Sequence, residues 1–294
     1  TGCCLRNDID PMHLKIRHRT EYRYETPVRY SIQELRLTPP STAGQQIDKW
    51  KISTPIKASN SIDTFGNVCS VFVQESPYTS MMIEAEGEVH TQDAFEFIDE
   101  TKAVSPYYLL QQTHLTETTQ EMLDYFSYSL PKKNSVDQVL KLAEAVQGLI
   151  VYTPGQTNFA TTAAQSFAMK SGVCQDHAHI MLGLCRASNI PARYVSGYFF
   201  AEESPNLASH AWIDVCSDIE KGVWTSVDIT HACLVDSRHI RLAIGRDYYS
   251  AAPVKGVRSG GGGRERQVAR AGGPRDWRRL FHRRRPVEHH DGRH

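Results

Sequence analysis

The stretch Ser171-Gly172-Val173-Cys174-Gln175-Asp176 opens a helix-forming segment, and the organisation of the chain can be worked out from it. Apolar residues follow at spacings of three and four and predict a helix over residues 173–188: Ile180, Met181, Leu184 and Ala187. A free thiol is only a few per cent ionised at neutral pH, and the unpaired N–H groups and dipole of a helix N-terminus favour the thiolate. Cys174 is therefore a candidate nucleophile.

Two later segments supply groups that can activate such a thiol. His210 lies in Ser209-His210-Ala211-Trp212, at the start of an expected strand, and Asp228 ends the next one. Adjacent antiparallel strands can bring these two side chains together. The histidine would then accept the thiol proton, while the carboxylate fixes its tautomer and stabilises the imidazolium. We therefore predict Cys174 as nucleophile, His210 as its base and Asp228 as the group that orients the histidine.

The pattern on either side of this constellation predicts an α+β protein in two parts. Residues 13–90 contain short strands at close spacing, which favour an antiparallel β-sandwich-like domain: 13–17, 32–37, 47–54, 68–73 and 82–90. Beyond Ser105-Pro106, helices are expected over 118–125, 135–150, 161–169 and 173–188, and strands over 192–200, 211–215 and 223–227. The predicted organisation is an extension at 1–11, a β-domain at 12–105, a catalytic core at 106–257 and a disordered Gly/Arg-rich tail at 258–294.

Composition narrows the class of protein. The 294 residues are 40% hydrophobic and 22% charged, and no apolar run approaches the ~18 residues of a membrane span. Seven cysteines without a CxxC pair favour a reducing, cytoplasmic setting, and no secretory signal is visible. The tail carries eleven arginines and four acidic residues, so the rest of the chain is acidic and gives no electrostatic case for binding nucleic acid or membrane. A nucleic-acid-binding role of the Arg-rich tail is a separate hypothesis.

Several motifs together resemble the bacterial transglutaminase-like superfamily over roughly residues 12–257. They are Gly172-Val173-Cys174-Gln175-Asp176 with its helix, the strand Ile190-Pro191-Ala192-Arg193-Tyr194-Val195-Ser196-Gly197-Tyr198, Ser209-His210-Ala211-Trp212, Trp224 to Asp228, Arg238-His239-Ile240-Arg241 and Gly245-Arg246-Asp247-Tyr248. The resemblance implies a papain-like core, with a nucleophile helix packed on an antiparallel sheet, and catalytic roles for Cys174, His210 and Asp228. The chain departs from the family at Ile229-Thr230-His231, where Pro-Thr-Asn is usual.

The family includes transglutaminases, amidases, proteases and inactive relatives. The expected function is therefore thiol-dependent acyl transfer on peptide or glutamine carboxamide bonds through a cysteine thioester, with a protein or peptide as substrate. The triad does not decide whether water or an amine resolves the thioester. A catalytically silent scaffold that binds proteins is the alternative.

A metal site is the competing interpretation of the residues around Cys174. His177 shares a helical face with Cys174, but His179 does not, and no fourth ligand is evident, so we expect no metal or cofactor. An oxyanion hole needs two donors; the Cys174 backbone N–H is one candidate, and Tyr152 or Gln156 the other. The remaining cysteines within the patterned region are expected to be core residues: Cys69, Cys185, Cys216 and Cys233.

Overall fold

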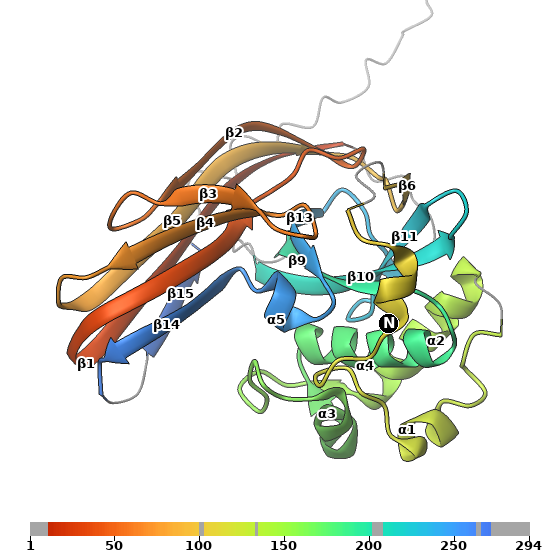
Figure 1. Ribbon diagram of the computed structural model, residues 1–294. Coiled ribbons are helices and arrows are strands. Elements are labelled where there is room, and N and C mark those ends of the chain that lie inside the picture. The colour runs from red at the N-terminus through yellow and green to blue at the C-terminus, as the bar shows by residue number, and fades with distance from the viewer. Residues whose placement is uncertain (1–10, 100–102, 133–134, 202–207, 263–265, 272–294) are drawn as a thin grey trace, which may run out of the picture.

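The computed structural model describes residues 11–99, 103–132, 135–201, 208–262 and 266–271, which form two antiparallel sheets and a group of helices (Figure 1). The first sheet contains β1 (Met12–Thr38), β2 (Gln45–Ser53), β3 (Ser59–Ile62), β4 (Val68–Gln74), β5 (Tyr78–Thr91), β14 (Val254–Gly260) and β15 (Arg266–Ala271). The second contains β6 (Glu96–Ile98), β9 (Ala192–Phe199), β10 (Ala208–Asp218), β11 (Val223–Asp228), β12 (Cys233–Leu234) and β13 (His239–Gly245).

The first sheet is built along β1, which spans 27 residues and which the sequence predicted as two separate strands. The first half of β1 pairs with β5, and the second half pairs with β4. The β1–β5 register breaks between Arg23 and Val28, a stretch that contains Pro27, which has no N–H to give to a ladder. The chain bends at this break, and the sheet folds over on itself.

One cross-layer contact shows how the sheet folds. Trp50 of β2 lies opposite Gly87, which in turn lies opposite Ile16 of β1. Its indole N–H nevertheless donates to the carbonyl of Leu37, at 2.9 Å. A straight strand would hold residues 16 and 37 roughly 70 Å apart, at ~3.3 Å per residue. The two halves of β1 therefore face each other across a shared apolar core, and the predicted sandwich-like domain is confirmed.

Gly87 makes this crossing possible. A Cβ at position 87 would come within 2.3 Å of the Trp50 ring and of the Lys49 carbonyl. Only glycine leaves room for the indole to cross the sheet.

The predicted tail and domain limits differ from the structure. β14 and β15 run antiparallel to β1, with Leu35 opposite Val254 and His18 opposite Ala271. Residues 258–260 and 266–271 are therefore not disordered, because their backbone groups complete a ladder with β1. Residues 272–294, and residues 1–10 of the predicted extension at 1–11, lie outside the described residues. The chain also enters the second sheet before residue 105, since β6 pairs with β11.

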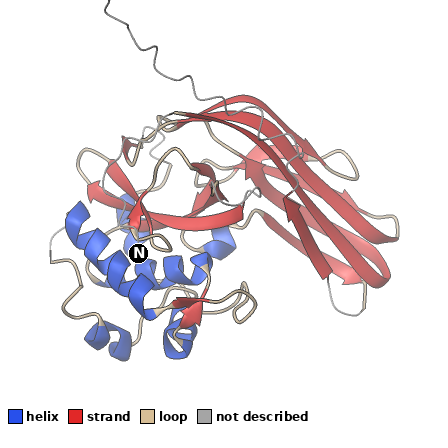
Figure 2. Ribbon diagram, turned by 180° about the vertical axis from the view of Figure 1, so that it is seen from behind, coloured by secondary structure: helices blue, strands red, loops and turns tan. Residues whose placement is uncertain are grey.

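The second sheet has the order β12-β11-β10-β9-β13, and the helices gather on one side of it, as Figure 2 shows from behind. They are η1 (Pro106–Leu110), α1 (Gln120–Tyr125), α2 (Val136–Leu149), α3 (Ala163–Met169), α4 (Cys174–Ala187) and α5 (Tyr248–Ala251). The apolar stripe of α4 packs against β9 and β10, and α2 and α3 pack on α4. None of the described helices combines the length and apolarity needed to cross a bilayer.

The two sheets share a core. Tyr198 of β9 and Ile240 and Leu242 of β13 belong to the apolar cluster of the sandwich. The Tyr198 hydroxyl also hydrogen bonds His18 Nδ1 of β1, at 2.8 Å. The sandwich therefore supports the back of the sheet that carries His210 and Asp228.

Candidate active site

Cys174 is the first residue of α4, at a turn that has no room for a larger residue at position 172. A Cβ on Gly172 would lie 2.6 Å from the Asp176 Cβ and 2.8 Å from Ser166 Oγ. The short parallel pair β7 (Val151–Tyr152) and β8 (Ser171–Gly172) leads directly into this turn. As the first helical residue, Cys174 has one of the unpaired N-terminal N–H groups of α4.

The buried carboxylate of Asp176 caps this helix. Its Oδ2 accepts hydrogen bonds from the Val173 N–H and the Thr157 hydroxyl, each at 2.7 Å. Burial raises the pKa of Asp176, although these hydrogen bonds act in the opposite direction. Asp176 thus fixes the turn that presents Cys174.

His210 lies on β10 and reaches the last residue of β11. Its Nε2 lies 2.7 Å from Asp228 Oδ2, which leaves Nδ1 for the hydrogen bond with Cys174. Burial lowers the pKa of His210, but the charge and hydrogen bond of Asp228, together with the bond to Cys174, outweigh it and raise this pKa to about 9. The imidazole is therefore protonated at neutral pH, and the structure brings together all three residues singled out in the sequence.

The Asp228 carboxylate accepts hydrogen bonds from more than one histidine. The same oxygen, Oδ2, lies 2.6 Å from Nδ1 of His231 and 3.0 Å from Nε2 of His239. Burial would raise the pKa of this fully buried carboxyl, but the charge and hydrogen bond of His210, with the bonds from His231 and His239, hold it well below its usual range. Asp228 therefore stays ionised and can orient His210 continuously.

His239 extends the network away from the thiol. Its Nδ1 lies 3.1 Å from Asp236 Oδ1, so the ring bridges two carboxylates. Burial lowers the pKa of His239, but hydrogen bonds to Asp228 and Asp236 raise it to about 8. Phe199 packs against the rings of His210, His231 and His239 and covers the cluster.

The sequence did not predict the parts that His231 and His239 play in this network. His231 stands where the family usually has asparagine, which was noted as a departure without a role. His239 lies in the quoted motif Arg238-His239-Ile240-Arg241 but had no assigned function. Their positions in the chain were available, but nothing in the sequence showed that both rings converge on one oxygen of Asp228.

Tyr152 ends β7 and pairs with Gly172 of β8, two residues before Cys174. Burial raises the pKa of its hydroxyl, and the charges of Cys174 and Asp228 raise this pKa further. The hydroxyl therefore stays protonated at neutral pH and can donate a hydrogen bond. Gln156, the other candidate donor, is an exposed residue of the following turn.

His177 and His179 serve the fold. The Nε2 of His177 donates to the Ile150 carbonyl at 3.1 Å, and its Nδ1 bonds the Thr230 hydroxyl at 3.0 Å. The Nε2 of His179 accepts from the backbone N–H of Tyr248, and burial lowers the pKa of this ring to about 4. Both rings therefore have hydrogen-bond partners within the core.

A different set of donors near the thiol could hold a metal. Among the described residues, one nitrogen each of His210 and His231 and one oxygen of Asp228 lie within 4.8 Å of one another. Two imidazoles and a carboxylate suit Zn²⁺. A metal bound there would occupy the nitrogen through which Asp228 orients His210.

Comparison with known proteins identifies two matching regions of the chain. Residues 14–90 match the bacterial transglutaminase-like N-terminal region, and residues 125–229 match the transglutaminase-like superfamily. The uncharacterized protein ML0607 of Mycobacterium leprae is 29% identical over 278 residues, covering 87% of this chain and 96% of its own. The uncharacterized protein Rv2569c of Mycobacterium tuberculosis is 28% identical over 271 residues, covering 83% of this chain and 86% of its own.

A solved structure shares the fold. The crystal structure of "a Putative Cysteine Protease from Cytophaga hutchinsonii" matches with a TM-score of 0.64 and 19% identity, covering 90% of this chain and 92% of that one. The two matched regions follow one another along a fold of the same kind. The chain therefore contains a bacterial transglutaminase-like N-terminal region followed by a transglutaminase-like core.

Proposed function

We propose that this protein is an enzyme that transfers acyl groups through a thioester on Cys174, with His210 as acid and base and Asp228 as the group that orients it. The observation that carries this proposal is the position of His210. One of its ring nitrogens hydrogen bonds Asp228 at 2.7 Å, and the ring also hydrogen bonds the thiol at the start of α4. This is the arrangement that a thiolate–imidazolium pair requires.

The reaction follows from these contacts. The Cys174 thiolate attacks the carbonyl carbon of a peptide or glutamine side chain, and the carbonyl oxygen becomes an oxyanion. The Cys174 backbone N–H and the Tyr152 hydroxyl donate to this oxyanion. The C–N bond then breaks, His210 gives its proton to the leaving nitrogen, and a thioester remains on Cys174.

Water or an amine completes the cycle. The now neutral His210 takes a proton from the acceptor, which attacks the thioester carbonyl, and the Cys174 thiolate leaves. Water as acceptor makes the protein a protease or amidase, and an amine makes it a transglutaminase. The protease assignment in the name of the Cytophaga hutchinsonii protein supports hydrolysis.

A groove of about 660 Å³ supports a peptide as substrate. It lies between the sandwich and the core, and aromatic side chains from the core line one part of it: Phe159, Tyr248 and Tyr249. Tyr248 lines the groove and packs against the same core cluster as Cys174. Substrate side chains would lie along these rings.

The described cysteines support a reducing setting. Five of them are free thiols: Cys69, Cys174, Cys185, Cys216 and Cys233. A cytoplasmic location, as the sequence predicted, would keep the nucleophile reduced.

The experiment is mass spectrometry of a glutamine-containing peptide incubated with the protein, with and without an added primary amine. Deamidation or cleavage indicates water as acceptor, and amine incorporation indicates transglutamination. Cys174→Ala should abolish each product while circular dichroism shows an intact fold, and Cys69→Ala in the sandwich should leave each unchanged. Products made equally by Cys174→Ala would refute the proposal, and no product from any protein would favour the catalytically silent scaffold.

A further inference from the structure

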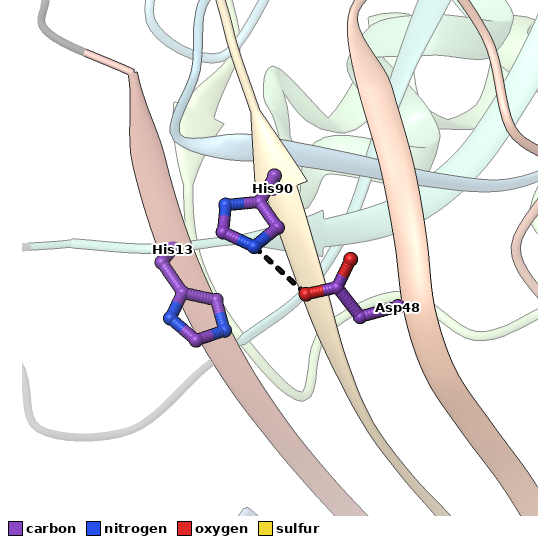
Figure 3. A group of neighbouring side chains, drawn as sticks. All are labelled: His13, Asp48 and His90. Carbon is purple, nitrogen blue, oxygen red and sulfur yellow. Dashed lines mark ion pairs between the residues drawn. The ribbon is translucent and has the colours of Figure 1, made fainter.

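The outer face of the sandwich carries a group of three side chains that the proposed reaction does not use. His13 and His90 lie directly opposite each other on β1 and β5, and Asp48 lies beside them on β2 (Figure 3). One ligand atom from each residue lies within 4.8 Å of the other two. The side chains are open to solvent, with exposed fractions of 44% for His13, 54% for His90 and 38% for Asp48.

A bulge in β2 places Asp48 in this group. Ile47 pairs with Val89 and Lys49 pairs with Glu88, so Asp48 is an extra residue between two consecutive pairs. Ile47 packs against the sandwich core and Trp50 points into it, so the bulge adds an outward-facing residue between them. Bulges re-aim side chains in this way and are common at binding sites.

The nitrogen and oxygen atoms that could bind a metal already make contacts with one another or with a neighbouring carboxylate. His90 Nε2 lies 2.7 Å from Asp48 Oδ2, and His13 Nε2 lies 3.2 Å from Glu88 Oε2. The two imidazole rings stack at 4.3 Å with an angle of 7° between them.

We propose that His13, His90 and Asp48 bind one divalent transition-metal ion, for which Zn²⁺ is the best match. Two imidazole nitrogens and a carboxylate oxygen are typical Zn²⁺ ligands, whereas Mg²⁺ and Ca²⁺ prefer oxygen alone. At Zn²⁺ bond lengths of about 2.0–2.2 Å, tetrahedral ligand atoms lie roughly 3.4 Å apart. The three ligand atoms already lie within 4.8 Å of one another, so each pair has to close by at most about 1.4 Å to reach this spacing.

The fourth position can be filled by water or by Glu88, whose carboxylate already contacts His13. The ion would join β1, β5 and β2 at the end of the sandwich where β1 begins. Its role would be structural and would not involve the thiol.

The test is calorimetric titration of the full chain with Zn²⁺ at pH 7.5, and with Mg²⁺ as the comparison ion. His13→Gln, His90→Gln and Asp48→Asn should each remove one site or weaken it at least ~10-fold, the smallest loss typical even of residues that only support a ligand. His114→Gln, at an exposed histidine outside both three-residue groups, is the matched control and should bind as the wild type does. Mg²⁺ should not compete.

Zn²⁺ bound elsewhere on the protein does not affect the comparison between the wild type and the site variants. The tail histidines, such as His289 and His290, are the same in every variant. His231→Asn removes a donor from the group beside Cys174 and should leave Zn²⁺ binding at the sandwich site intact. Two results would overturn the proposal. One is Zn²⁺ binding by all three site variants that equals the wild type in stoichiometry and affinity. The other is a wild-type protein that binds Zn²⁺ no more tightly than Mg²⁺.

Discussion

Replacing Asp228 with asparagine tests the centre of the proposed mechanism. One carboxylate oxygen now accepts from three imidazole rings, at 2.6–3.0 Å. Asparagine keeps the shape but offers one carbonyl oxygen and an NH₂ group that can only donate. If the NH₂ group faces His210, Nε2 must accept, the proton moves to Nδ1, and the ring can no longer take the thiol proton.

The size of the effect follows from the pKa of His210. It is raised from 6.5 to about 9 although burial acts to lower it, and Asp228 supplies the largest opposing contributions. Without that carboxylate the pKa should fall from about 9 toward 6.5. The equilibrium that forms the thiolate–imidazolium pair should then become up to ~300-fold less favourable, which is ~3 kcal/mol at 1.36 kcal/mol per unit of pKa.

The assay is the rate at which a small alkylating agent labels Cys174 at pH 6–7, which needs no knowledge of the substrate. We expect Asp228→Asn to slow labelling by up to ~300-fold, and the chemical step of catalysis by ~10⁴ if it behaves as the equivalent change does in serine proteases. Asp218→Asn, near the far end of β10, should have no effect. A properly folded Asp228→Asn protein labelled at the wild-type rate would refute the reasoning, whereas loss of the fold would assign Asp228 to structure.

The same substitution should change how stability depends on pH. His210 has a folded-state pKa above its unfolded value, so its contribution is fully present below pH 6.5 and is lost as the pH rises through about 9. The wild type should therefore lose up to ~3 kcal/mol of unfolding free energy from this group across that window. Urea denaturation at pH 6 and pH 9.5 should show a smaller loss in Asp228→Asn.

Three further predictions concern the same site. Gly172→Ala should lower the unfolding free energy, measured by urea denaturation, by ~1–3 kcal/mol and should slow labelling of Cys174, because the added Cβ would press on Asp176. Unchanged stability would show that the turn has more space than the structure gives it. His239→Gln should lower the unfolding free energy by about 1–3 kcal/mol in the same measurement, because the carboxylates of Asp228 and Asp236 lose a hydrogen-bond donor. It should slow labelling of Cys174 less than Asp228→Asn does, and an equal loss of rate would make His239 as important as Asp228. Brief alkylation at pH 7 followed by peptide mapping should label Cys174 well before Cys185, because burial raises the pKa of the Cys185 thiol to about 12. Equal labelling of the two cysteines would contradict an activated thiol at Cys174.

The sequence was sufficient to place the elements around the thiol. The apolar stripe behind Cys174 predicted a helix over 173–188, and α4 spans Cys174–Ala187. The expected strands at 211–215 and 223–227 are β10 and β11, and the structure brings His210 and Asp228 together as their order suggested. These predictions succeeded because periodicity and helix-start signals are local properties of the chain.

The architecture of the sandwich required the tertiary structure. Alternation of polar and apolar residues identified two pieces of β1, but not that they form one strand which bends near Pro27 and closes the sandwich. The tail was predicted to be disordered because glycine and arginine cannot build a core, yet residues 266–271 need only backbone groups to pair with β1. Composition reports what side chains can bury, and it gives no information on an open strand edge elsewhere in the fold.

The same distinction applies to the sites. The sequence singled out Cys174, His210 and Asp228 because each stands in a motif with local structure, and their role stays a prediction. His231 and His239 lie only three and eleven residues from Asp228, whereas the convergence of His13, Asp48 and His90 on the outer sheet joins residues up to 77 positions apart. The contacts on the outer sheet depend on strand register and on a bulge, which are fixed when whole sheets pack and leave no local pattern in the chain.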